Sequence, residues 1–389
     1  MAGTDDVPVP QDYKLDLLRK KYLLQTHAEG ADEAVLRYDI EYQITAHDAG
    51  ALYAHVCKEL QWEESAGRLV GLQAAAAAKL SGLDAAVAAA EETEGEMELR
   101  AALVAKAEYL ADSGDAAGAA AAFDAAERKT AGAGPKLDLV LARARLELGL
   151  ELRAELRRTL DRARALSAAG GDWERRNKLK VYEAVEAMAT RRFDVAAKLL
   201  LDCIATFSAT EVMSYEQCVF YTVLTAVLTL DRPSLKAKVI SSPEVLSVID
   251  TIPHLSSFLN ALHDCKYAEF FRAFSGLLES VRTDPYLHPH YRFFMREVRA
   301  KAYSQFLESY KSVTLDSMAR AFGVSSEFID EELANFIVRG QVAARIDRVA
   351  GVVQTTRPDA KNGLYQQTIK RGDAVLSRMQ NLSKIIDVD

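Results

Sequence analysis

Apolar residues recur three and four positions apart through most of this chain. Between Gln73 and Phe207 the residues around them are rich in Ala, Leu, Glu, Arg and Lys, which have high helix propensity. Apolar side chains at this spacing lie on one face of an α-helix. One such stripe is formed by Leu99, Leu103, Ala107 and Leu110. The pattern therefore predicts a series of long amphipathic helices.

Short polar breaks divide these helices into pairs. The breaks fall at residues 113–115, at Arg191-Arg192 and at residues 264–266, and Gly132 to Pro135 ends another helix. Each pair is predicted to form an antiparallel hairpin, and stacked hairpins build a curved solenoid. We therefore expect an N-terminal helical segment over residues 1–72 and tetratricopeptide-like helical repeats over residues 73–283.

The pattern changes after Thr283. A turn-rich stretch leads into a helix that runs from His290 to about Tyr310, so residues 284–312 are predicted to form a linking helix. Thr314 can cap the helix that follows, and Gly323 can end it.

A second short helix is expected to begin at Ser325 or Ser326 and to end at Gly340. Two strands then follow, Val342 to Ile346 and Val352 to Thr355, joined near Ala350-Gly351. Helix, turn, helix and a two-stranded wing together predict a winged helix over residues 313–356. The fold class predicted is mainly α.

Residues 357–389 predict one more amphipathic helix. Such a helix could fold back on its own domain, or it could join a bundle with equivalent helices of other chains. Its apolar stripe consists of Tyr365, Ile369, Leu376, Met379, Leu382 and Ile386.

Composition and charge narrow the possible partners. Hydrophobic residues make up 49% of the chain, which excludes wholesale disorder, and the net charge is −8. A net negative charge gives no general attraction to phosphate backbones or anionic membranes. The second helix of the winged helix has more acidic than basic residues, which disfavours DNA binding. These residues are Glu327, Asp330, Glu331 and Glu332 against Arg339.

The sequence indicates a soluble protein of the cytoplasm and nucleus. No uncharged apolar run approaches the ~20 residues that span a bilayer, and the N-terminus does not resemble a signal peptide. Cysteines form no CxxC pair, and we expect each to be a small buried apolar residue in a reducing compartment. They are Cys57, Cys203, Cys218 and Cys265.

No enzyme signature is found in the sequence. Phosphate-binding loops, dinucleotide fingerprints, HExxH and GxSxG are all absent. The pair His288 and His290 resembles the start of a metal-peptidase motif, but Val298 and Lys301 stand where that motif needs Ser and Asp. We therefore predict no catalytic residues, no metal site and no cofactor.

The order of helical repeats, winged helix and terminal helix resembles the PCI family. This family supplies scaffold subunits to the proteasome lid, the COP9 signalosome and translation initiation factor three. The stretch from Pro289 to Asp347, with PHYRFFMREVRAKAYSQFLESYKSVTLDSMARAFG, is similar to PCI subunits of the lid, as are residues 213–246 and the tail RPDAKNGLYQQTIKRGDAVLSRMQNLSKII. The Ala-rich segment from Gln73 to Glu94 departs most from the family pattern.

This resemblance implies a non-catalytic structural subunit of the lid of the 19S regulatory particle. Its partners would be other PCI and MPN subunits of the lid, with ATPase subunits of the base as further candidates, and neither nucleic acid nor membrane. Wing edges would pair between subunits and the terminal helices would join one bundle. The wing contacts implied are Val342, Ala344, Ile346, Val352 and Val353.

Two other functions remain open from the sequence. One is a subunit of the COP9 signalosome, similar to its first subunit, that acts on cullin modification. The other is a nucleic-acid adaptor that uses the winged helix.

Overall fold

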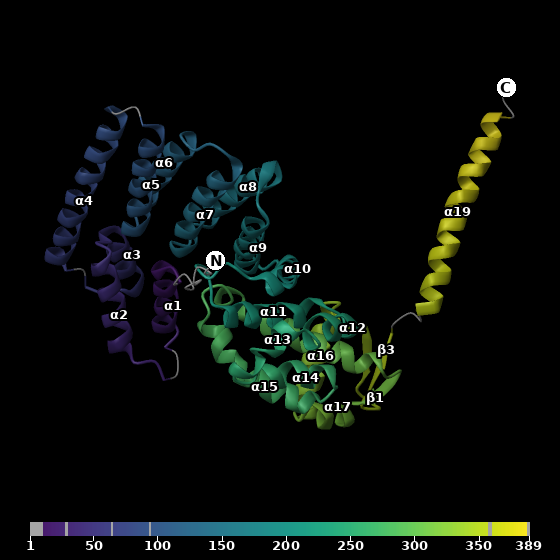
Figure 1. The fold of residues 1–389 in the computed structure, drawn as a ribbon. Helices are drawn as coiled ribbons and strands as arrows, with labels where there is room; N and C mark the ends of the chain where they lie inside the picture. The colour runs from purple at the N-terminus through teal and green to yellow at the C-terminus, as the bar shows by residue number, and fades with distance from the viewer. Residues whose placement is uncertain (1–10, 28–29, 64, 93–94, 357–359, 387–389) are drawn as a thin grey trace. The chain divides into compact units, whose positions relative to one another are not determined.

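The computed structural model describes residues 11–27, 30–63, 65–92, 95–356 and 360–386, with side chains for residues 364–383 of the last range. The chain divides into two compact units, one up to Val298 and one from Arg299. Helix α16 (Tyr291–Glu308) contributes residues to both. The predicted fold class is confirmed, because helices make up most of the described chain and a small sheet follows them (Figure 1).

Helices of the first unit follow one another with short connections. The long ones are α1 (Tyr13–Gln25), α2 (Glu33–Ala46), α3 (Gly50–Leu60), α4 (Ala66–Glu92), α5 (Glu96–Ser113), α6 (Ala116–Arg128), α7 (Ala133–Gly149), α8 (Arg153–Gly170), α9 (Trp173–Ala189), α10 (Phe193–Cys203), α11 (Tyr215–Thr229), α14 (Leu255–His263) and α15 (Tyr267–Thr283). Shorter turns of helix are η1 (Ile204–Thr206), α12 (Arg232–Leu235), η2 (Lys236–Ile240), α13 (Pro243–Leu246), η3 (Ile249–Thr251) and η4 (His288–His290).

The hairpin of α5 and α6 shows how local signals set the repeat. Gly114 ends α5 with φ of +80°, a left-handed conformation that favours glycine. The side chain of Asp115 then caps α6 by accepting a hydrogen bond from the backbone N–H of Gly118 at 3.0 Å. Ala107 and Ala119 are fully buried, and their small size lets the two helices pack closely. The predicted hairpin is confirmed.

Two other predicted boundaries move by a few residues. The break expected at Gly132 to Pro135 is shorter, because α7 already begins at Ala133 and its first turn includes Pro135, where no helical N–H is needed. The helical pattern that extends to Phe207 in the sequence is followed only to Cys203, where α10 ends and the chain tightens into η1. Both breaks at 191–192 and 264–266 are confirmed.

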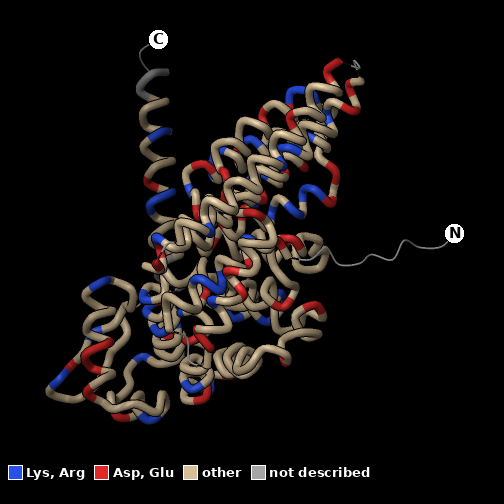
Figure 2. Tube along the Cα trace, turned by 90° about the vertical axis from the view of Figure 1, so that its left-hand side faces the viewer, with Lys and Arg blue, Asp and Glu red and all other residues tan. Residues whose placement is uncertain are grey.

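Helix α1 is held inside the first unit by buried ion pairs. The ammonium of Lys21 lies 2.7 Å from Glu59 and 2.5 Å from Glu151, and the ammonium of Lys14 lies 2.8 Å from Asp112. Burial alone would raise the pKa of Glu151, but its hydrogen bond to Lys21 and the charge of Lys21 hold that pKa below its usual range. These contacts join α1 to α3, to α5 and to the turn that follows α7. Along the helices of this unit both signs of charge are interspersed (Figure 2).

The second unit is a winged helix with a third strand. It contains the end of α16, then β1 (Ser312–Thr314), α17 (Leu315–Phe322), α18 (Ser326–Val338), β2 (Ala344–Asp347) and β3 (Val352–Thr355). The strands are antiparallel in the order β1-β3-β2. The predicted two-stranded wing is confirmed as β2 and β3. The third strand, β1, was not predicted, because it is too short to show an alternating pattern and has one buried residue, Val313. The first predicted wing strand also begins two residues later than expected.

Predicted caps of the winged helix are confirmed. The hydroxyl of Thr314 accepts a hydrogen bond from the N–H of Ser317, that of Ser325 accepts one from the N–H of Phe328, and Gly323 is left-handed with φ of +69°. Apolar faces of α17 and α18 then pack against α16. This core consists of Tyr303, Met318, Phe322, Ile329, Leu333 and Phe336, each at most 2% exposed.

Candidate protein-interaction surfaces

The outer edge of β2 is the first candidate surface. Strand β3 lies in the centre of the sheet, and its residue Val353 is opposite Val313 on one side and Ile346 on the other. Its backbone is therefore already paired on both sides. Within the described chain, β2 is paired on one side only, so its other side can accept a strand from a neighbour.

Side chains of the predicted wing contacts divide into two groups. Val342 and Ala344 are 4% exposed and Val353 is fully buried, so the module itself covers them. Ile346 and Val352 are half-buried. A neighbour can thus contact this wing through the backbone of β2 and through Ile346, whereas a contact through Val353 would require the module to open.

The tip of the wing is a surface that the sequence analysis missed. The carboxylate of Asp347 accepts hydrogen bonds from the N–H groups of Val349 at 3.0 Å and Ala350 at 3.1 Å, and Gly351 is left-handed. This turn leaves the side chain of Val349 completely exposed. The short run Asp-Arg-Val-Ala-Gly has the turn residues that could have indicated it.

Acidic side chains of α18 are partly used within the module. Glu332 lies 3.0 Å from Arg299 and accepts a hydrogen bond from the hydroxyl of Tyr303 at 2.8 Å, and Asp330 lies 3.0 Å from Arg348. Burial, together with the nearby negative charge of Glu332, raises the pKa of the Tyr303 phenol. These carboxylates stabilise the winged helix, and their charge repels phosphates.

Helix α19 (Ala360–Ile386) is the second candidate surface, and all of its described side chains are exposed. Its apolar residues lie on one side at helical spacing, and Leu364 and Val375, which the sequence analysis did not include, extend the same side. Ile386 lies outside the described side chains. Exposed fractions are 67% for Tyr365, 61% for Ile369, 57% for Leu376, 63% for Met379 and 60% for Leu382.

The two histidines considered for chemistry are hydrogen-bonded to backbone carbonyl groups. His288 is hydrogen-bonded to the carbonyl of Arg282 at 2.6 Å, and His290 to that of Ala189 at 2.9 Å. Among the described residues, no group of three or more His, Cys, Asp or Glu side chains could hold a metal ion. In the same part of the chain, no helix is long and apolar enough to cross a bilayer.

Three cysteines are buried as expected, and one is not. Cys57, Cys203 and Cys218 lie in the core of the first unit. Cys265 is exposed, because it occupies the left-handed position of the turn between α14 and α15, with φ of +60°. The expectation for Cys265 was wrong because the apolar residues near it in sequence point away from that turn.

Comparison with known proteins shows the family of the chain. Residues 67–238 match the family described as 26S proteasome subunit RPN7, and residues 276–357 match the PCI domain. The chain is 46% identical over 374 residues to the 26S proteasome non-ATPase regulatory subunit 6 homolog of Arabidopsis thaliana, covering 96% of this chain and 97% of the relative. It is 42% identical to the subunit of that name from Dictyostelium discoideum, covering 89% and 91%.

A yeast relative extends the similarity. The regulatory subunit RPN7 of Saccharomyces cerevisiae is 40% identical over 297 residues, which cover 75% of this chain and 68% of the relative. These relatives are named as proteasome subunits, so the signalosome alternative is not favoured. At this identity and coverage, the chain belongs to the family of 26S proteasome non-ATPase regulatory subunit 6, the Rpn7 family, and has its PCI domain at the C-terminal end.

Proposed function

We infer that this chain is a non-catalytic structural subunit of the lid of the 26S proteasome regulatory particle, and that it scaffolds assembly for ubiquitin-dependent protein degradation. Its role is to bind other subunits through α19 and the wing. The similarity to proteins named as regulatory subunits supports a place in this particle.

The observation that carries this proposal is the uncovered apolar side of α19. Tyr365, Ile369, Leu376 and Met379 are each more than half exposed, although they lie together at helical spacing. Burying apolar surface contributes about 25 cal/mol per Å². A contiguous apolar side of this length is therefore favourable to cover, and a bundle of helices from sister subunits covers it efficiently.

The wing supplies a second contact by strand pairing. Backbone groups on the outer side of β2 can continue the sheet into a neighbouring PCI subunit. Ile346 is half-buried at this edge and can add an apolar contact. We therefore keep the predicted wing contact for the backbone of β2 and for the side chain of Ile346.

The proposed partners are the other PCI and MPN subunits of the lid, with ATPase subunits of the base as further candidates. Neither nucleic acid nor a membrane is a proposed partner, and cytoplasm and nucleus are the proposed locations. The division into residues 1–72, 73–283, 284–312, 313–356 and 357–389 likewise remains a proposal.

Paired substitutions in α19 test the bundle contact. We expect Leu376→Asp with Met379→Asp to prevent incorporation into the lid, because two charges would enter the buried side of a bundle. The matched control, Ser377→Asp with Asn381→Asp, adds the same charge to the polar side of the same helix and should assemble normally. The measurement is the fraction of tagged chain that sediments with the regulatory particle.

Deletion of residues 361–389 provides the complementary test. The shortened chain should remain folded and soluble but should not enter the particle. Normal assembly by this truncation would refute the bundle contact. Cleavage of ubiquitin conjugates by the purified chain alone would refute the non-catalytic role.

A further inference from the structure

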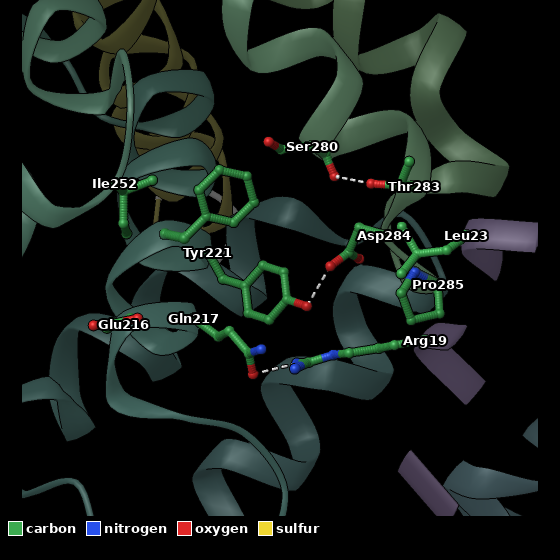
Figure 3. A pocket seen from close by; sticks show the side chains of 11 residues that line it. Arg19, Leu23, Glu216, Gln217, Tyr221, Ile252, Ser280, Thr283, Asp284 and Pro285 are labelled. Carbon is green, nitrogen blue, oxygen red and sulfur yellow. Dashed lines mark hydrogen bonds between the residues drawn. The ribbon is translucent and has the colours of Figure 1, made fainter. Parts of the chain in front are cut away.

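A cavity of about 300 Å³ opens in the first unit between α1, α11 and the end of α15. Arg19 and Leu23 lie one helical turn apart on α1, so both face it. Tyr221 comes from α11, Ile252 follows η3, and Ser280 lies near the end of α15 (Figure 3). Four segments distant in sequence thus form a pocket at the lower end of the size range for ligand sites.

Much of the cavity wall is apolar. Leu23, Tyr221 and Ile252 line it, and the hydroxyl of Tyr221 donates a hydrogen bond to the carboxylate of Asp284 and presents its ring to the cavity. The other oxygen of Asp284 accepts hydrogen bonds from the N–H groups of Tyr286 at 2.9 Å and Leu287 at 3.0 Å. Asp284 thus accepts three hydrogen bonds from its own chain; burial raises the pKa of its carboxyl, and these hydrogen bonds and the nearby charge of Arg19 oppose that shift.

Arg19 gives the cavity a positive charge, which also acts on the buried carboxyl of Asp284. Its guanidinium donates hydrogen bonds to the amide oxygens of Gln217 and, at 3.5 Å, of Gln11, and within the described chain it forms no ion pair with a carboxylate. Gln217 is itself held in place, since the same amide oxygen accepts a hydrogen bond from the backbone N–H of Ser214 at 3.0 Å. A guanidinium has five N–H donors, so Arg19 retains donors for a ligand.

We propose that this cavity binds a short segment of a partner chain in which one carboxylate lies next to a large apolar side chain. The carboxylate accepts hydrogen bonds from Arg19, and the apolar side chain covers Leu23, Tyr221 and Ile252. A guanidinium pairs well with a carboxylate in this bidentate manner. Glu216 also lines the cavity, so one negative charge fits better than a run of acidic residues.

The proposal goes beyond the scaffold function and does not depend on it. Neither α19 nor the wing contributes to the cavity. Its test can therefore use the full-length chain without other subunits, and its failure would leave the assembly proposal untouched.

Methyl NMR of the isotopically labelled chain tests this directly, since Leu23 and Ile252 supply reporter methyl groups in the cavity. The probe is the dipeptide acetyl-Phe-Glu-amide, and acetyl-Phe-Gln-amide is the neutral control. We expect saturable shifts of both methyl groups with a millimolar Kd for the acidic probe. The neutral control should bind at least about tenfold more weakly.

Substitutions connect the effect to its residues. Arg19→Gln should abolish the preference for the acidic probe, whereas Arg157→Gln, on the exposed side of α8, should leave it unchanged. Ser280→Trp, at the exposed rim, should fill the cavity and block both probes without removing a core residue. Equal binding of the two dipeptides, or no shift at Leu23 and Ile252, would overturn the proposal.

A chain without residues 1–10 identifies the occupant. This segment contains Asp5, Asp6 and Val7 and joins Gln11 beside Arg19. Similar binding with and without the segment supports a partner chain as the source of the ligand. Binding only after its removal would show that the protein's own N-terminal segment fills the cavity, and the partner proposal would fail.

Discussion

Helices α1 and α19 expose very different amounts of apolar surface. On α1, Leu15, Leu17 and Leu18 are at most 2% exposed, and the rest of the first unit surrounds them. On α19, Leu376 and Met379 are more than half exposed, although the spacing of apolar residues is more regular. An apolar stripe therefore shows which side of a helix is to be buried, but not which chain buries it.

Charged residues reinforce this difference. Lys14 and Lys21 are 4% exposed on α1, and both are paired with carboxylates from other helices. Lys370 and Arg371 of α19 are exposed, as a solvated polar side requires. Helix α1 is therefore a structural element of its own unit, whereas the described side chains of α19 are left uncovered. Four predictions test this contrast.

Removing Lys21 should have the largest effect on stability. Lys21→Ala removes a buried ammonium and leaves Glu59 and Glu151, which are partly buried, without their shared partner, and the loss of a buried ion-pair partner costs about 3–5 kcal/mol. Urea denaturation followed by tryptophan fluorescence suits the measurement, because Trp62 and Trp173 both lie in the first unit. Lys20→Ala is the control, since Lys20 is more exposed and its surface pairs contribute about 1 kcal/mol at most. Equal effects of the two substitutions would show that α1 is not anchored by buried charge.

The same substitution in both helices gives a direct comparison. Leu18→Ala removes a buried side chain and should lower the free energy of unfolding by about 3 kcal/mol. Leu376→Ala removes an exposed side chain and should change the free energy of unfolding of the isolated chain by less than about 0.5 kcal/mol. Circular dichroism during urea denaturation reports on both units. A large loss from Leu376→Ala in the isolated chain would mean that α19 packs on its own protein.

Lowering the pH should destabilise the contacts of α1 less than the removal of Lys21 does. Hydrogen bonding and charge from Lys21 hold the pKa of Glu151 below its usual range despite burial, so ionised Glu151 adds stability at neutral pH. That contribution is present above the pKa of the unfolded chain and is lost as pH falls through the lower pKa of the folded chain. The effect should be smaller than removal of Lys21, because Glu59 still pairs with the lysine.

Glu151→Gln is the variant that tests this pH dependence. It should lower stability at neutral pH and reduce the loss of stability in acid, as measured by unfolding over a series of pH values. An unchanged slope in the acidic range would show that another carboxylate is responsible.

Sequence patterns were sufficient wherever the signal was local. Thr314 and Gly323 were predicted as the ends of one helix because a cap and a left-handed glycine depend only on neighbouring residues. The apolar stripe of α19 was found for the same reason. The hairpin of α5 and α6 likewise follows from Gly114 and Asp115.

Features that depend on distant residues could not be predicted. The two carboxylates that pair with Lys21 belong to Glu59 and Glu151, which are 38 and 130 positions away in the sequence. Nothing near Lys21 in the sequence therefore indicates that this lysine is buried. Strand β1 exists because β3 pairs with it, and three residues carry too little pattern of their own. The cavity beside Arg19 could not be predicted for the same reason, since its walls come from four separate segments.

The smallest change proposed for α19 is the addition of one methyl group at Gly372. It lies between Ile369 and Leu376 on the apolar side, and a Cβ added there would meet nothing within 4 Å in the isolated chain. Gly372→Ala should therefore stabilise the helix by about 1 kcal/mol, measured as slower amide hydrogen exchange within α19. If sister helices pack closely at this point, the same methyl group should weaken incorporation into the particle, although the helix itself is more stable. Ser377→Ala, on the polar side, should also stabilise the helix slightly and leave incorporation unchanged. Improved incorporation by both variants would instead indicate that helix formation, and not contact at Gly372, limits the docking of α19.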